Sequence, residues 1–61
     1  MRQIIIEDFT GGESDLPLIY YISQDGVDGY IYTYCVRNSS DTTAIVWYYV
    51  NATDGSFTTK S

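Results

Sequence analysis

Two runs of β-branched and aromatic residues, 30–37 and 43–50, constrain the fold more than any other feature of this sequence. Such residues favour strands, and successive side chains of a strand point to opposite faces. The polar residues 38–41 between the runs have the composition of a four-residue hairpin loop. We therefore expect an antiparallel hairpin in which Tyr32 lies opposite Trp47.

Further strands are expected on either side of this hairpin. An Asp-Gly pair at residues 54–55 predicts a two-residue turn that places Phe57 opposite Ala52, after which residues 56–60 form a short edge strand. The apolar residues 4–6 are expected to add another strand. The sequence therefore predicts a mainly β protein, a small antiparallel β-meander of four to five strands, in a single small domain spanning residues 1–61.

The apolar segment 16–23 is compatible with two structures. Its aromatic and β-branched residues favour a strand, and the glycine-containing residues 24–29 after it are expected to form a turn. However, Ser14 and Asp15 are suitable helix N-caps, and Gly26 is a suitable helix end. The alternative is an α+β fold with one short helix at about 15–24, packed on a three- or four-stranded antiparallel sheet.

The expected register divides the sheet into two faces. One face is mostly small and aliphatic and is expected to form the core, with Cys35 acting as a buried hydrophobe; its members include Ile31, Cys35, Val46, Val50 and Phe57. The other face is aromatic, and tyrosine and tryptophan are common at interfaces. It is expected to be a second half of the core, a partner-binding face or a dimer interface, formed by Tyr30, Tyr32, Tyr34, Trp47 and Tyr49.

The composition argues against catalysis. The chain has no histidine and only one cysteine, so it offers neither an internal disulfide nor an activated thiol nucleophile. Carboxylates alone would have to form any metal site, and no metal-binding motif is present. We expect no catalytic residues, no metal, no cofactor and no enzymatic activity.

Charge points to a protein partner. Three basic residues against eight acidic ones give a net charge of −5, which disfavours direct binding to nucleic acid or to an anionic membrane. A positively charged protein surface would instead attract the chain. A homodimer is also expected, because so small a domain buries its surface poorly. The acidic partner-binding residues are expected to gather where two glycine-containing loops meet: Glu13, Asp15, Asp25 and Asp28.

In size, acidity and lack of catalytic groups, the chain resembles anti-CRISPR and anti-restriction proteins, which are small acidic inhibitors encoded by phages. The resemblance is one of composition along the chain, and it assigns no role to any individual residue. It implies a non-enzymatic inhibitor that imitates DNA or RNA and binds a basic nucleic-acid-binding surface of a host complex. The alternative is a β-sheet interaction module or a self-associating structural subunit that uses the aromatic face.

Location follows from the absence of targeting features. Residues 1–8 do not have the pattern of a secretion signal, and no apolar run is long enough to span a membrane. A cytosolic protein is expected, in the host cytosol if a phage encodes it.

Overall fold

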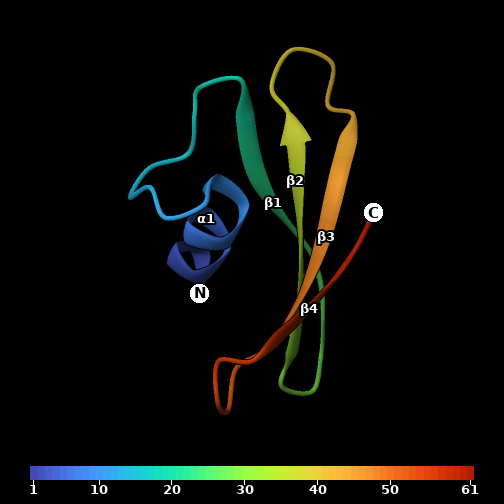
Figure 1. The fold of residues 1–61 in the computed structure, drawn as a ribbon. Helices are drawn as coiled ribbons and strands as arrows, with labels where there is room; N and C mark the ends of the chain where they lie inside the picture. Colours follow the sequence, from blue (N-terminus) through green and yellow to red (C-terminus); the bar gives the residue numbers. More distant parts are fainter.

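The computed structural model describes all residues, 1–61, and contains four antiparallel strands and one short helix (Figure 1). The strands follow one another in the sheet in their order along the chain, β1-β2-β3-β4. The antiparallel meander is therefore confirmed, in an α+β form with a single helix. The elements are α1 (Arg2–Thr10), β1 (Tyr20–Asp28), β2 (Ile31–Asn38), β3 (Ala44–Asn51) and β4 (Phe57–Lys60).

The strand expected at residues 4–6 is wrong, because this segment lies within α1. Two of its three isoleucines are buried in the core, which offsets the modest helix propensity of β-branched residues. Gly11 ends the helix in the left-handed conformation, with φ 78°. The Gly12 N–H then donates to the Glu7 carbonyl at 2.8 Å. This pattern is a Schellman motif, which satisfies carbonyls at the end of the helix.

The alternative helix at 15–24 is also wrong, since the segment enters β1 at Tyr20. Before the strand, the Tyr20 N–H donates to the Pro17 carbonyl at 3.0 Å in a turn. β1 then continues to Asp28 through the residues expected to form a turn, and the extra length is absorbed by a β-bulge between Gln24 and Gly26. The strand interpretation of 16–23 thus holds only from residue 20 onward.

A two-residue connection, Gly29 and Tyr30, joins β1 to β2. Gly29 has φ 63°, the positive value that the first central position of a primed hairpin turn requires. Glycine has no Cβ and adopts this conformation without steric cost.

The predicted register between β2 and β3 is wrong, because Tyr32 lies opposite Val50 and not opposite Trp47. The loop comprises residues 39–42, one position later than expected, since the Asn38 N–H donates to the Thr43 carbonyl at 2.9 Å. A bulge then adds one residue to β3 next to Ala44. A slip by an odd number of residues moves the side chains of one strand to the other face relative to its partner.

The register between β3 and β4 differs from the predicted one by an even number of residues, so the faces are as expected. Phe57 lies opposite Val50, and the chain turns through the four residues 52–55. The Asn51 N–H donates to the Ser56 carbonyl at 2.7 Å and closes this loop. The two-residue turn expected at residues 54–55 is therefore wrong.

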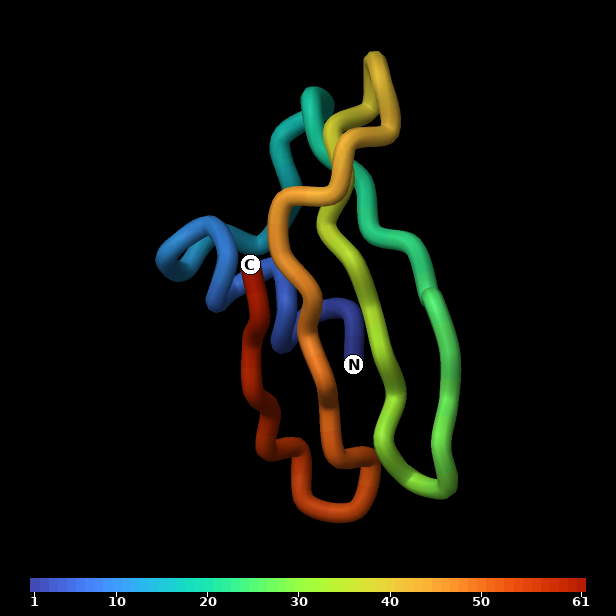
Figure 2. Tube along the Cα trace, turned by 90° about the vertical axis from the view of Figure 1, so that its right-hand side faces the viewer, coloured from blue at the N-terminus to red at the C-terminus, as the bar shows by residue number.

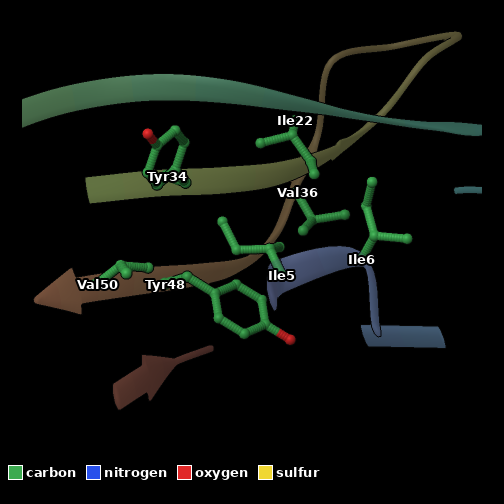
Figure 3. Packing of buried hydrophobic residues seen from close by; sticks show 7 residues of the cluster. All are labelled: Ile5, Ile6, Ile22, Tyr34, Val36, Tyr48 and Val50. Atoms are coloured by element: carbon green, nitrogen blue, oxygen red, sulfur yellow. The ribbon is translucent and has the colours of Figure 1, made fainter. Parts of the chain in front are cut away.

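The core lies between α1 and one face of the sheet, as Figure 3 shows. Two isoleucines point from the helix toward side chains of β1, β2 and β3. The cluster consists of Ile5, Ile6, Ile22, Tyr34, Val36, Tyr48 and Val50.

The predicted core is partly correct. Val50 belongs to the cluster, and Val46 and Phe57 pack against it while partly buried. Ile31 and Cys35 lie on the opposite face, because the slip in register reversed β2 relative to β3. Cys35 is nonetheless completely buried.

Candidate functional site

One face of the sheet has no layer of the chain over it, and we call it the open face. Figure 2 shows the sheet from this side, with α1 behind it. Its central members alternate with the core residues along the two middle strands, and its edges are the residues opposite them in β1 and β4. The central members are Ile31, Thr33, Cys35 and Arg37 of β2, with Trp47, Tyr49 and Asn51 of β3.

The centre of the open face is apolar and aromatic. Trp47 lies opposite Cys35, and Tyr49 lies opposite Thr33. The two aromatic side chains are half-buried, whereas Cys35 is fully buried. Burial raises the pKa of the Cys35 thiol, so this group remains protonated and unreactive near neutral pH.

A polar network crosses the open face from β1 to β2. The Arg37 guanidinium lies 3.2 Å from the Asp25 carboxylate, the single ion pair of the structure. Arg37 also donates to the Ser23 hydroxyl at 3.1 Å, and Ser23 donates to Asp25 at 2.9 Å. The bulge after Gln24 allows Asp25 to reach this network. The charges of Arg37 and Asp25 therefore offset each other.

A shallow depression of ≈ 300 Å³ lies toward the β3–β4 end of the sheet. The phenol of Tyr49 is the only titratable group on its walls, so the depression offers no acid–base pair. Its walls are formed by Ile31, Tyr49, Asn51, Ser56, Phe57 and Thr58.

The other candidate surface, which we call the acidic side, comprises Glu7 and Asp8 of α1 with Glu13 and Asp15 of the following loop. All four are exposed. The Gln3 side-chain amide donates to the Glu7 carboxylate at 3.4 Å and to the Ser14 carbonyl at 3.2 Å. This shared donor holds the loop against the helix, so the carboxylates of the two segments lie on one side of the molecule.

Asp8 also attaches the helix to the sheet. The Tyr48 hydroxyl donates to the Asp8 carboxylate at 2.6 Å. Burial, together with this hydrogen bond, raises the pKa of the Tyr48 phenol well above its usual value. Tyr48 is therefore a permanent donor and not a candidate base.

The structure does not bring the four predicted acidic residues together. Glu13 and Asp15 lie on the acidic side, in the loop after α1. Asp28 is the last residue of β1, beside the turn into β2. This turn lies at the end of the sheet away from the loop after α1 (Figure 1). Asp25 lies on the open face, in its ion pair with Arg37.

The five predicted aromatic residues are also divided. Tyr32 and Tyr34 face α1, and Tyr34 is buried in the core. Trp47 and Tyr49 lie on the open face, while Tyr30 lies in the β1–β2 turn with 61% of its surface exposed. The expected all-aromatic face is wrong, because the bulge in β3 reversed the pairing of β2.

Sequence reasoning missed Ser23 and Arg37 as partners of Asp25, and Gln3 as the link of the acidic side. Ser23 and Asp25 are two residues apart, which is the spacing of neighbours on one face of a strand. The sequence, however, predicts a turn around Gly26. Gln3 and Glu7 are four residues apart, the spacing at which helical side chains meet. That pattern has meaning only when the segment is helical.

No group of three or more histidine, cysteine or acidic side chains lies close enough to bind a shared metal ion. The single helix, α1, lacks the length and apolar character needed to cross a membrane. Comparisons with protein-family models, curated proteins and solved structures gave no match. The open face and the acidic side are therefore the two candidate sites of the molecule.

Proposed function

We propose that this protein is a non-enzymatic acidic inhibitor that binds a basic, nucleic-acid-binding surface of another protein through its acidic side. One observation carries the proposal: seven of the eight carboxylates form no ion pair, and four of these lie on the acidic side. The guanidinium of Arg2, the one basic group of α1, donates to the Ile22 carbonyl at 3.5 Å. The field of the acidic side is therefore left largely unneutralised.

Such a surface is suited to an electrostatic partner. Exposed carboxylates on one side of a protein steer a positively charged partner toward it and raise the association rate. They also match a site built to bind phosphates, where Lys and Arg are concentrated. The predicted residues Glu13 and Asp15 keep their role in this proposal. Glu7 and Asp8 take the places of Asp25 and Asp28.

The experiment is a competition assay. The protein is immobilised, a partner is captured from host lysate at low salt, and the protein is then titrated against labelled nucleic acid bound to that partner. We expect displacement of the nucleic acid and steep weakening as the salt concentration rises. Simultaneous binding of both ligands, without mutual weakening, would contradict the proposal.

A matched pair of variants locates the surface. Glu13→Gln with Asp15→Asn removes two charges from the acidic side and is expected to weaken binding roughly tenfold, mainly by slowing association. Asp28→Asn with Asp54→Asn removes the same charge elsewhere and is expected to have a much smaller effect. Equal effects of the two double variants would show that only the total charge matters.

The alternative, a module that associates through an exposed sheet face, is favoured by the half-buried Trp47 and Tyr49 of the open face. Aromatic association depends little on salt, so the salt titration separates it from charge-driven binding. The open face and the acidic side lie on opposite faces of the sheet, so the use of one leaves the other free.

A further inference from the structure

The open face is electrically balanced, although the chain is strongly acidic. It carries two positive side chains, Arg37 and Lys60, and two negative ones, Asp25 and Asp28. The net charge of −5 therefore lies entirely on the rest of the molecule. Two copies of an acidic protein repel each other wherever their acidic surfaces meet, and this face is the extensive surface that avoids such repulsion.

The same face exposes apolar surface that the chain itself does not cover. Trp47 and Tyr49 are half-buried at its centre, and the helix packs on the other side of the sheet. Tryptophan and tyrosine contribute strongly when they become buried at an interface. A partner for this face should therefore be apolar at the centre and nearly neutral overall, which are the properties of the open face itself.

The dimensions also fit. Three strands of eight or nine residues and the four-residue β4, about 4.8 Å apart with a rise of about 3.3 Å per residue, form a face of roughly 450 Å² in projection. Two such faces in contact would bury about 900 Å² in total, which is in the range of weak, transient interfaces. This predicts a weak dimer, populated at micromolar or higher concentration.

We propose that the open face binds the open face of a second copy, related by a two-fold axis, to form a four-layer dimer with helices outside and sheets inside. Stacked sheets of this kind pack about 10 Å apart. A two-fold axis makes the interface self-complementary, so one patch serves both copies. The two acidic sides then point away from each other, and both remain available to other partners.

Trp47 provides a direct test, because it is the only tryptophan of the chain and lies at the centre of the proposed interface. Sedimentation is measured from about 1 µM to about 1 mM protein, together with Trp47 emission and its quenching by acrylamide. We expect the mass to rise from 6.9 kDa toward twice that value. Over the same concentration range, the emission should shift to shorter wavelength and quenching should fall. Added salt should not weaken the dimer.

Neighbouring threonines of β4 provide the matched variants. Thr58 lies opposite Tyr49 on the open face, whereas Thr59 lies opposite Tyr48 on the helix side, and both are exposed. Thr58→Glu is expected to raise the dissociation constant at least tenfold, and Thr59→Glu less than threefold. Both substitutions add the same charge to the same edge strand. A difference between their dissociation constants therefore shows which face of the sheet forms the interface, and it cannot result from net charge.

Three results would overturn the inference. The first is a mass that stays at 6.9 kDa throughout the concentration series. The second is a dimer in which quenching of Trp47 is unchanged, which would indicate pairing of edge strands instead. The third is equal weakening by Thr58→Glu and Thr59→Glu. These outcomes concern only self-association and leave the competition assay of the acidic side unaffected.

Discussion

The two hairpin loops at the ends of β3 share one architecture although their sequences differ. Each begins with an asparagine whose N–H donates to the carbonyl of the sixth residue, at 2.9 Å from Asn38 to Thr43 and at 2.7 Å from Asn51 to Ser56. In each, the N–H of the fifth residue donates to the asparagine carbonyl at 2.8 Å. The two loops therefore have the same length and the same backbone closure.

Their side chains also act alike. In both loops, the asparagine side chain accepts the N–H two residues further on, and so does the aspartate at the fourth position. The distances are 2.8 to 3.0 Å. These hydrogen bonds between side chains and nearby backbone N–H groups stabilise the turn, where the strand-to-strand pairing of the backbone is interrupted. The common pattern is Asn-x-Ser/Thr-Asp-x-Ser/Thr, present at residues 38–43 and 51–56.

Two differences separate the loops. The fifth residue has positive φ in both, but it is Gly55 in the second loop, with φ 78°, and Thr42 in the first, with φ 62°. A β-branched residue is strained in this conformation. In addition, a bulge follows only the first loop: Val36 pairs with Val46 and Arg37 with Ala44, which leaves one extra residue in β3. Loop chemistry thus determines the turn, while a bulge outside the loop determines which face each side chain takes.

The largest loss of stability is expected from a substitution of Tyr34, which this bulge places on the core side of the sheet. Tyr34→Ala removes a ring from the core beneath α1 and is expected to cost about 3 kcal/mol of unfolding free energy. For so small a domain, that is much of the total stability. Thr33→Ala, one residue earlier on the open face, is expected to cost less than about 1 kcal/mol. Thermal melts compare the two, and equal costs would contradict the observed register.

A smaller loss of stability is expected when the fifth residue of the second loop is replaced by threonine, the fifth residue of the first loop. Gly55→Thr places a β-branched side chain at φ 78°, which is expected to cost about 1–2 kcal/mol of unfolding free energy. Space is not limiting, since an added Cβ would lie 3.9 Å from Ile4 Cδ1. Gly55→Asn serves as the control, because asparagine tolerates this conformation. Urea denaturation measures both, and a larger loss for asparagine would exclude a backbone origin.

The reverse exchange is expected to stabilise the protein. Thr42→Gly relieves the strained backbone of the first loop, and the gain is partly offset by the greater freedom of glycine in the unfolded chain. We expect a net gain of about 0.5–1 kcal/mol in urea denaturation. Thr43→Gly, at the next position, removes a strand-forming residue without relieving positive φ and is expected to destabilise.

The smallest effect concerns the loss of folding stability at acid pH. Hydrogen bonds from Thr43 and Ser56 lower the pKa values of Asp41 and Asp54, respectively, in the folded state. Their contribution to stability is present above the ordinary pKa of 3.8 and is lost as the pH falls through the lower folded values. Asp41→Asn with Asp54→Asn should therefore make the acid limb of a pH–stability curve shallower. An unchanged limb would show that other carboxylates govern it.

The sequence alone predicts β2, β3 and β4 closely, because their alternating β-branched and aromatic residues fall between clear turn residues. It does not predict α1, since three successive isoleucines favour a strand locally. Burial in the core and the Gly11–Gly12 ending override that preference. The two glycines after residue 10 were the available indication of a helix end.

The candidate surfaces were less predictable than the strands. A single extra residue in β3 exchanged the partners of β2, so Tyr34 moved to the core side while Trp47 stayed on the open face. No pattern in the residues 43–46 marks that bulge. The acidic side depended in turn on the helix, because Glu7 and Glu13 come together only when residues 2–10 coil.

The order of the strands also has a consequence for the rate of folding. Each strand pairs with its neighbour in the chain, so every hairpin closes a short loop at low entropic cost. The side-chain hydrogen bond of the longest range is that between Asp8 and Tyr48, which joins residues 40 apart. During synthesis, α1 leaves the ribosome well before β3, and the apolar side chains of Ile5 and Ile6 stay uncovered until that strand follows.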